Sequence, residues 1–434
     1  MVLMKSFSLR KENIILLLIL LLALAARLYI WFDFLGKPSY FIQPDTSSYL
    51  HPGMQLIENG TFPSFSRTPV YPIFIAFIHK YISSSNAVMA LIQVFISVAA
   101  VLISYAVSRR IFDLFPAVIC ALFVALDFQS MLTANFLLSD TLFTVILCIF
   151  LIKLVDWCQQ EDKQFLFDLR TVVVLGGWLS VLSLCRPISF LAFVPIALWM
   201  FFALREKKKY ISVLICFFCL SSASMPILWS VRNYFHTGVF FFTTISSKDI
   251  FLYRAAWNIS FIEKRDFKDV RDELKQRAIE KQEKERLNDG ELAIWERNEG
   301  IKILKNNLLV TLWQGIRGGM EMYFDMTSFL NFKIKEESFP SKIIIFWRAV
   351  HLFLLYAGLI LGSVIALKNY LFPHQRQVIY LFLVVIFYFT LFSVGGEAYG
   401  RFRVPIVPAL SVISASGWGY LFNRNKLQAK KLHC

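Results

Sequence analysis

The feature that most constrains this chain is a series of long apolar runs separated by short polar segments. An α-helix needs about 20 apolar residues to cross the hydrocarbon core of a bilayer. Because lipid offers the backbone no hydrogen-bond partners, such runs must be helical. The sequence predicts about ten crossings, at residues 13–32, 87–107, 114–134, 141–157, 171–185, 188–204, 210–230, 343–367, 377–394 and 404–422. The expected fold is therefore an all-α polytopic membrane protein.

The composition and the placement of charge agree with this expectation. Hydrophobic residues make up 57% of the chain and charged residues 17%, which is more apolar than a soluble domain. The formal net charge of +15 would also suit a nucleic-acid binder. However, residues 231–342 carry nearly equal numbers of basic and acidic side chains, so the excess lies among the hydrophobic segments. That distribution follows the positive-inside rule, and we expect membrane lipids rather than nucleic acid as partners.

One orientation of the chain in the membrane places all the basic loops on the same side. Counted alternately along the chain, the loops on one side are all basic and contain Arg109, Arg110, Lys153, Lys163, Arg170, Arg205, Lys207, Lys208, Lys209, Lys368, Arg376, Arg424, Lys426, Lys430 and Lys431. The first crossing reads as a retained anchor rather than a removable signal peptide. Both termini are thus predicted to be cytoplasmic. The external segments are 33–86, the connection near 135–140, the turn at Cys185–Arg186, the stretch 231–342, and the loop 394–403.

Three regions follow from this topology. Residues 1–230 form an N-terminal transmembrane module whose first external loop is 33–86, and residues 343–434 form the C-terminal transmembrane helices. Between them, 231–342 is an external helical insert. Within it, apolar residues recur at spacings of three and four along 263–307, as an amphipathic helix requires. We expect a small helical domain there.

Ionisable residues gather at the outer ends of many different crossings. They are Asp45, Arg67, Asp140, Arg186, Arg232, Glu397, Arg401 and Arg403. The topology places them at one membrane face. Charged groups close to hydrocarbon are costly and usually line a cavity or pair with one another. Arg binds phosphate through a bidentate fork, so the set suits an anionic lipid headgroup.

Simpler interpretations exist for several of these positions. Asp45 is also compatible with a helix cap before a short interfacial helix at 46–58. Ser139 or Asp140 is compatible with a cap on the fourth crossing, and Arg186 with the end of a loop before Pro187. Arg401 and Arg403 are compatible with interfacial anchors, although external positive charge opposes the positive-inside trend. Asp127 lies near the outer end of the third crossing and is interpreted as structural.

Several of these motifs resemble a known family. The stretch Pro44–Leu50, together with Arg67 to Ala76, is similar to the first external loop of bacterial GT-C glycosyltransferases. These are integral-membrane enzymes related to protein O-mannosyltransferases and to the aminoarabinose transferase of lipid A. Further landmarks occur in the family's order, namely Leu138–Phe143, Arg186–Pro187, Arg232–Tyr234 with Gly238, and Arg401–Pro408. The resemblance covers about residues 10–425.

The resemblance implies a function and a location. It implies interfacial helices in the first external loop, a sugar donor carried on polyprenyl phosphate, inversion at the anomeric carbon, and a catalytic Asp, here Asp45. The location it implies is the bacterial inner (plasma) membrane, with the site on the external or periplasmic side. Many members have Asp-Glu at the catalytic position, whereas Thr46 follows Asp45 here, and the second motif commonly has Glu where this chain has Asp140. These departures leave the acceptor open, as a lipid, a glycan or a protein.

Chemical roles can be assigned on this basis. Asp45 is the candidate base, and the Arg residues are candidates to hold the phosphate as negative charge develops on it. Asp140, Glu397 and Tyr71 are further candidates for substrate binding. A divalent metal is not required; Asp45 and Asp140 are the candidate ligands for one.

Two other classes of protein compete with this interpretation. A polysaccharide polymerase or ligase of another membrane fold would also use external Arg residues, but it would not need an acid directly after the first crossing. A lipid or sugar transporter would place polar groups at mid-bilayer in broken, repeated helices. No internal repeat is visible in the sequence.

Overall fold

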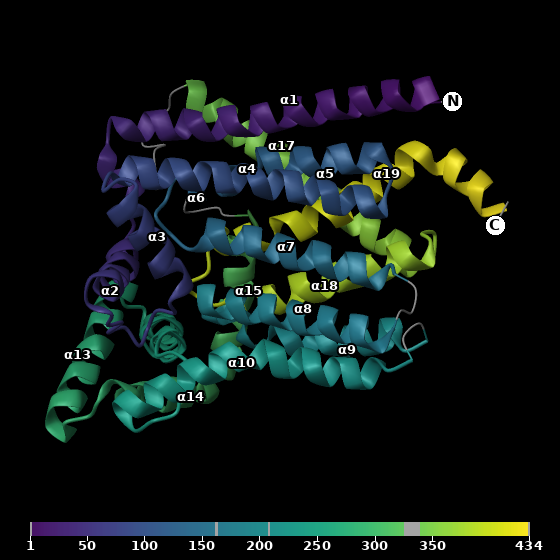
Figure 1. The fold of residues 1–434 in the computed structure, drawn as a ribbon. Coiled ribbons are helices and arrows are strands. Elements are labelled where there is room, and N and C mark those ends of the chain that lie inside the picture. Colours follow the sequence, from purple (N-terminus) through teal and green to yellow (C-terminus); the bar gives the residue numbers. More distant parts are fainter. Residues whose placement is uncertain (1, 161–163, 207–208, 325–338, 433–434) are drawn as a thin grey trace.

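The computed structural model describes residues 2–160, 164–206, 209–324 and 339–432, and every regular element in these ranges is a helix (Figure 1). Nine helices in the described ranges are long and apolar enough to cross a membrane, which confirms the all-α polytopic fold. They are α1 (Val2–Leu35), α4 (Asn86–Ile111), α7 (Asp140–Cys158), α8 (Phe165–Cys185), α9 (Phe193–Leu204) with the preceding 3-10 turn η2 (Pro187–Ala192), α10 (Ile211–Thr237), α17 (Phe339–Leu367), α18 (Pro373–Ser393), and α19 (Val407–Leu432) with the preceding 3-10 turn η4 (Gly400–Ile406).

The long helices run side by side, and their connections alternate between two ends of the bundle. Figure 1 shows α2, α3 and α13 at one end, and the start of α1 and the end of α19 at the other. Near the second end, Arg109 Nε donates to Glu12 Oε1 at 3.0 Å, so the beginning of α1 lies against the end of α4. This alternation is the one expected from the basic loops.

The expected third crossing at 114–134 is wrong as one continuous helix. It is broken into α5 (Leu114–Leu126) and α6 (Phe128–Thr133). Asp127 is extended between them and caps α6 by accepting from Ser130 N at 2.9 Å. The buried Arg27 donates to the carbonyl oxygens of Ala125, at 3.0 Å, and Val124, at 3.4 Å, at the end of α5. Hydropathy cannot reveal the break. At the break, the side chains of Arg27 and Asp127 replace the backbone hydrogen-bond partners that a continuous helix would supply.

Residues 33–86, expected as the first external loop, form a compact helical unit between α1 and α4. It contains η1 (Pro38–Phe41), α2 (Thr46–Asn59) and α3 (Val70–Tyr81), so the short helix expected at 46–58 is confirmed. A Cβ on Gly53 would overlap the carbonyl oxygen of Pro72, so α2 and α3 touch through their backbones. Thr46 Oγ1 donates to the Leu137 carbonyl at 3.1 Å, which attaches the loop to the segment before α7.

The segment after α10 is also helical. It contains α11 (Ile245–Lys248), the π-helix η3 (Asp249–Ala255), α12 (Ala256–Glu263), α13 (Phe267–Glu285), α14 (Asp289–Asn306) and α15 (Leu308–Phe324). The helical run expected at 263–307 is confirmed by α13 and α14. Their apolar faces enclose a small core with Phe251, and Asn288 begins α14 with a capping box.

Candidate active site

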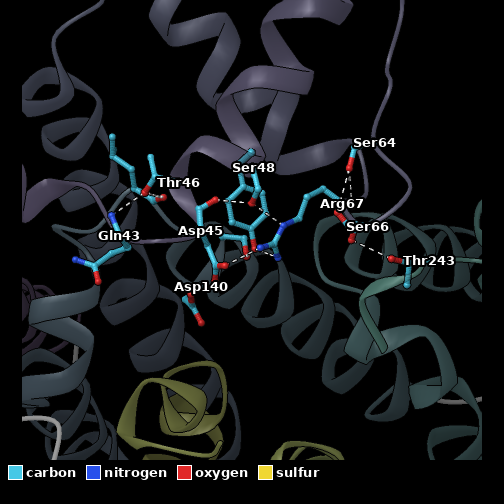
Figure 2. A network of polar contacts seen from close by, with 12 residues as sticks. Gln43, Asp45, Thr46, Ser48, Ser64, Ser66, Arg67, Asp140 and Thr243 are labelled. Carbon is cyan, nitrogen blue, oxygen red and sulfur yellow. Dashed lines mark hydrogen bonds and ion pairs between the residues drawn. The ribbon is translucent and has the colours of Figure 1, made fainter. Parts of the chain in front are cut away.

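Asp45 stands at the position directly before α2, but its side chain does not cap that helix. No side-chain hydrogen bond is made at this cap. The start of the helix is held instead by Ser48, whose hydroxyl donates to the Asp45 carbonyl oxygen at 2.6 Å. The carboxylate turns toward Arg67, as Figure 2 shows, and Arg67 Nη2 donates to Asp45 Oδ1 at 2.8 Å. The Asp45 side chain remains 43% exposed, so its carboxylate can be reached from outside the protein.

Arg67 is fixed on several sides by the segment between α1 and α4. Its Nε donates to Ser48 Oγ at 2.9 Å and its Nη1 to the Tyr49 hydroxyl at 3.1 Å. The guanidinium also lies over the Tyr49 ring, 4.3 Å from the ring centroid. The positive charge beside Asp45 is therefore preorganised, because the loop holds it in one orientation.

Asp140 is fully buried at the first turn of α7, and each of its oxygens faces an Arg. Arg186 donates to Oδ1, and Arg401 Nε donates to Oδ2 at 2.8 Å. Arg401 Nη1 also lies 3.6 Å from Asp45 Oδ2, so this guanidinium bridges the two acids. Ser139, at the cap position of α7, makes no capping hydrogen bond through its side chain. With its side chain only 9% exposed, Arg401 is not an interfacial anchor.

These five side chains form one cluster, which we call the Asp45–Arg401 cluster (Asp45, Arg67, Asp140, Arg186 and Arg401). They come from the segment between α1 and α4, from α7, from the turn before η2, and from η4, which are distant in the sequence. The cluster contains three guanidinium groups and two carboxylates, so it has an excess of positive charge when all five are ionised. Such a partly desolvated set favours binding of an anion.

Two of the expected site residues support the cluster from outside it. Arg232 donates to the carbonyl oxygens of Phe62 and Ser64 and lies over the rings of Phe65 and Trp229. It therefore holds the segment between α1 and α4 against α10. Tyr71 is fully buried, and its hydroxyl donates to Gln93 Oε1 at 3.1 Å.

Beside Arg67, Thr243 adds to this support. Its hydroxyl donates to the Ser66 carbonyl at 2.9 Å, a contact seen in Figure 2.

Arg403 belongs to a different, deeper cluster. Its Nη2 donates to Asp127 Oδ1 at 2.8 Å, and its Nη1 donates to the Tyr323 carbonyl at 2.6 Å and the Tyr356 hydroxyl at 2.9 Å. Arg401 and Arg403 therefore leave η4 toward different partners, although only one residue separates them. The structural interpretation of Asp127 agrees with this pairing.

Glu397 interacts with two charged residues, Arg254 and Asp249, that were not among the site residues expected from the sequence. Arg254 Nε donates to Glu397 Oε1 at 2.9 Å. Burial, together with the negative charges of Glu397 and Asp45, raises the pKa of Asp249 to about 7, although the positive charges of Arg254 and Arg67 oppose the rise. Asp249 and Arg254 are thus electrostatic neighbours of the Asp45–Arg401 cluster. In the sequence they look like solvated charges of the insert, and only the apolar residues near them, at 239–242 and 250–253, indicate that this segment is packed.

The pKa of Asp249 predicts a pH dependence of stability. An unfolded Asp has a pKa of about 3.9, so the folded protein holds an extra proton between about pH 4 and pH 7. Stability from this group is present below that window and is lost as the pH rises through it. We expect the melting temperature of the wild type to fall more between pH 5 and pH 8 than that of Asp249→Asn. Equal pH dependence in the two proteins would contradict the assignment.

The donor set does not fit the metal site considered from the sequence. Both oxygens of Asp140 are engaged by guanidinium groups, which leaves Asp45 as the one accessible carboxylate of that pair. In the described ranges, no group of three or more His, Cys, Asp or Glu side chains has an arrangement suited to a metal. We therefore derive no step through a metal ion.

Comparison with known proteins confirms the family resemblance. Residues 66–229 match the family described as dolichyl-phosphate-mannose-protein mannosyltransferase. The matched region contains Arg67, Asp140 and Arg186, whereas Asp45 and Arg401 lie outside it. No curated protein matches the chain.

Two solved structures of one similar protein confirm the fold. The archaeal oligosaccharyltransferase AglB from Archaeoglobus fulgidus, in complex with an inhibitory peptide and a dolichol-phosphate, is similar with a TM-score of 0.59 and 15% identity, over 98% of this chain and 52% of AglB. Its apo form gives a TM-score of 0.56 and 14% identity, over 96% of this chain and 51% of AglB. This chain thus spans about half the length of AglB. ArnT from Cupriavidus metallidurans in the apo state matches with a TM-score of 0.40 and 13% identity, over 92% of this chain and 77% of ArnT.

Proposed function

We propose that this chain, whose residues 66–229 match the dolichyl-phosphate-mannose-protein mannosyltransferase family, is a membrane glycosyltransferase. It transfers a sugar from a polyprenyl-phosphate donor to an acceptor hydroxyl at the external face of a bacterial plasma membrane. The observation that carries the proposal is the exposed carboxylate of Asp45 beside Arg67 and Arg401. AglB was solved with a dolichol-phosphate, which also supports a donor of this class.

The proposed reaction uses the cluster as follows. Asp45 accepts the proton of the acceptor hydroxyl, and the acceptor oxygen attacks the anomeric carbon of the donor. The bond between that carbon and the phosphate oxygen breaks, with inversion, through an oxocarbenium-like transition state. Arg401 and Arg67 stabilise the negative charge that develops on the departing polyprenyl phosphate. Asp140 orients Arg401 and Arg186 by pairing with both of them.

The competing classes are less well supported by this geometry. A polymerase or ligase of another membrane fold needs no acid after the first crossing, whereas Asp45 lies within salt-bridge distance of two Arg side chains. A transporter would place available polar groups in a broken helix. At the break between α5 and α6, however, Asp127 is already paired with Arg403 and Ser130.

A turnover assay tests the proposal. Purified full-length protein in detergent is given a panel of undecaprenyl-phosphate hexoses and pentoses, together with lipid, glycan and protein fractions of bacterial envelopes. We expect release of undecaprenyl phosphate that depends on one donor and one acceptor fraction. If the folded protein released no carrier from any donor, the proposed function would be refuted.

Labelling of single-Cys variants tests the proposed orientation. Because the basic loops all fall on one side, we expect Arg67→Cys and Glu280→Cys, on α13, to react with an impermeant thiol reagent in spheroplasts. Lys209→Cys should react only after the membrane is opened. Protection of Glu280→Cys together with labelling of Lys209→Cys would place the Asp45–Arg401 cluster on the cytoplasmic side.

A further inference from the structure

α15 has two faces of opposite character. Its buried residues, Gln314, Gly318 and Met322, recur every four positions and form one stripe toward the protein. On the other side of the helix lies what we call the apolar face of α15, which consists of Leu309, Leu312, Trp313, Ile316 and Met320. All five of these side chains are exposed, Leu309 by 83% and Ile316 by 59%. In a water-soluble domain such a contiguous apolar stripe would be unusual.

The buried stripe fixes the helix in this orientation. A Cβ on Gly318 would lie less than 2.5 Å from the carbonyl oxygen of Gly395, so the backbones of α15 and of the loop after α18 are in direct contact. Beside this contact, Arg317 lies over the Trp257 ring, 4.8 Å from its centroid. If α15 rotated to bury its apolar face, a residue with a side chain would replace Gly318 at the contact with Gly395. The contact has no room for a side chain, so this rotation is excluded.

The C-terminal turn of α15 is attached to helices that span the membrane. Tyr323 hydrogen bonds through its hydroxyl to Thr390 on α18, at 2.5 Å, and accepts at its carbonyl oxygen from Tyr356 on α17, at 2.5 Å. Arg348 on α17 donates to the Phe324 carbonyl at 2.7 Å. These three partners lie inside the candidate spans Ile343–Leu367 and Pro373–Ser393. The end of α15 therefore lies beside membrane-spanning helices rather than within the small core of α13 and α14.

The charges around α15 follow the pattern of an interfacial helix. The exposed Lys302 and Lys305 precede it on α14, while its apolar face carries no charged residue. Basic residues beside an apolar helix face suit contact with headgroups and acyl chains of a bilayer. By contrast, α13 exposes mainly charged residues, as expected of a helix in water.

We infer that the bilayer leaflet on the same side as the Asp45–Arg401 cluster covers the apolar face of α15. The partner is lipid hydrocarbon, and α15 is an embedded part of a segment that would otherwise be taken as an aqueous domain. Because α15 also packs on the loop that carries Gly395 and Glu397, the lipid surface lies directly beside that loop. The inference depends on the membrane fold and not on the proposed sugar transfer.

Spin-label accessibility in liposomes tests this inference. Nitroxides are attached at Leu312→Cys and Ile316→Cys in full-length protein whose native cysteines have been replaced. Phe353→Cys on α17, which is 70% exposed, is the lipid-facing control, and Glu280→Cys on α13 is the aqueous control. We expect both α15 labels to be several-fold more accessible to oxygen than to a water-soluble nickel chelate, as at Phe353→Cys. Accessibility like that of Glu280→Cys, or low accessibility to both reagents as under a second protein copy, would overturn the inference.

A second measurement, quenching of Trp fluorescence, uses protein that keeps its native cysteines. Brominated phospholipids quench Trp side chains that lie in the acyl region, so we compare quenching of the wild type and of Trp313→Phe in the same liposomes. We expect the quenched component to be larger in the wild type. Identical quenching would show that Trp313 does not contact acyl chains and would overturn the inference.

Discussion

Asp45→Asn is expected to reduce sugar transfer at least about a hundredfold while the protein remains folded. Asn preserves the shape of the side chain and can still cap a helix, but it cannot accept a proton. The structure strengthens this choice, because the wild-type carboxylate makes no cap hydrogen bond that the substitution would lose. What disappears is the charge beside Arg67 and Arg401 and the proton acceptor itself.

A matched control distinguishes catalysis from a general change in α2. Glu58 lies near the other end of the same helix and is exposed, so Glu58→Gln removes a carboxylate from α2 without touching the Asp45–Arg401 cluster. We expect it to retain wild-type turnover. Release of undecaprenyl phosphate by purified variants is measured with their melting temperatures. Wild-type turnover by a folded Asp45→Asn protein would remove Asp45 from the mechanism.

The long helices could be predicted from sequence because lipid imposes one strong rule. Every backbone group must be satisfied within a helix, so apolar runs and their lengths nearly determine the spans. The rule fails at 114–134, where the side chains of Arg27 and Asp127 satisfy the backbone instead. Such a replacement depends on residues that are about 100 positions apart, and no local pattern reveals it.

Part of the candidate site could be predicted as a group of residues, but the pairing of those residues could not. The topology correctly brings Asp45, Arg67, Asp140, Arg186 and Arg401 to one end of the bundle. Which carboxylate each Arg faces depends on packing between distant helices. Asp249 and Arg254 were missed for the same reason, since a charged side chain in the insert looks solvated until its neighbours are known.

The two Arg residues of η4 provide the second large effect, because they face different partners. Arg401→Ala leaves Asp140 paired with Arg186, so the fold should survive, while a developing phosphate charge loses a desolvated partner. Loss of such a partner costs about 2–5 kcal/mol, or roughly thirtyfold or more in turnover of the donor. Arg403→Ala instead leaves Asp127, which is fully buried, without its Arg. Breaking a buried pair costs about 3–5 kcal/mol of stability.

The double variant Asp127→Asn/Arg403→Ala makes the contrast decisive. Replacement of the Asp127 carboxylate, which has lost its Arg403 partner, should restore much of the stability that Arg403→Ala loses. The same replacement in Arg401→Ala should not restore turnover. Melting temperatures and donor turnover are measured in the same detergent for the wild type, Arg401→Ala, Arg403→Ala, Asp127→Asn/Arg403→Ala and Asp127→Asn/Arg401→Ala. A folded Arg403→Ala protein with no turnover, alongside an unfolded Arg401→Ala protein, would reverse the assignment and place the phosphate beside Asp127. Because Arg401 reaches Asp45 and Arg403 does not, we expect turnover to depend on Arg401 and stability on Arg403.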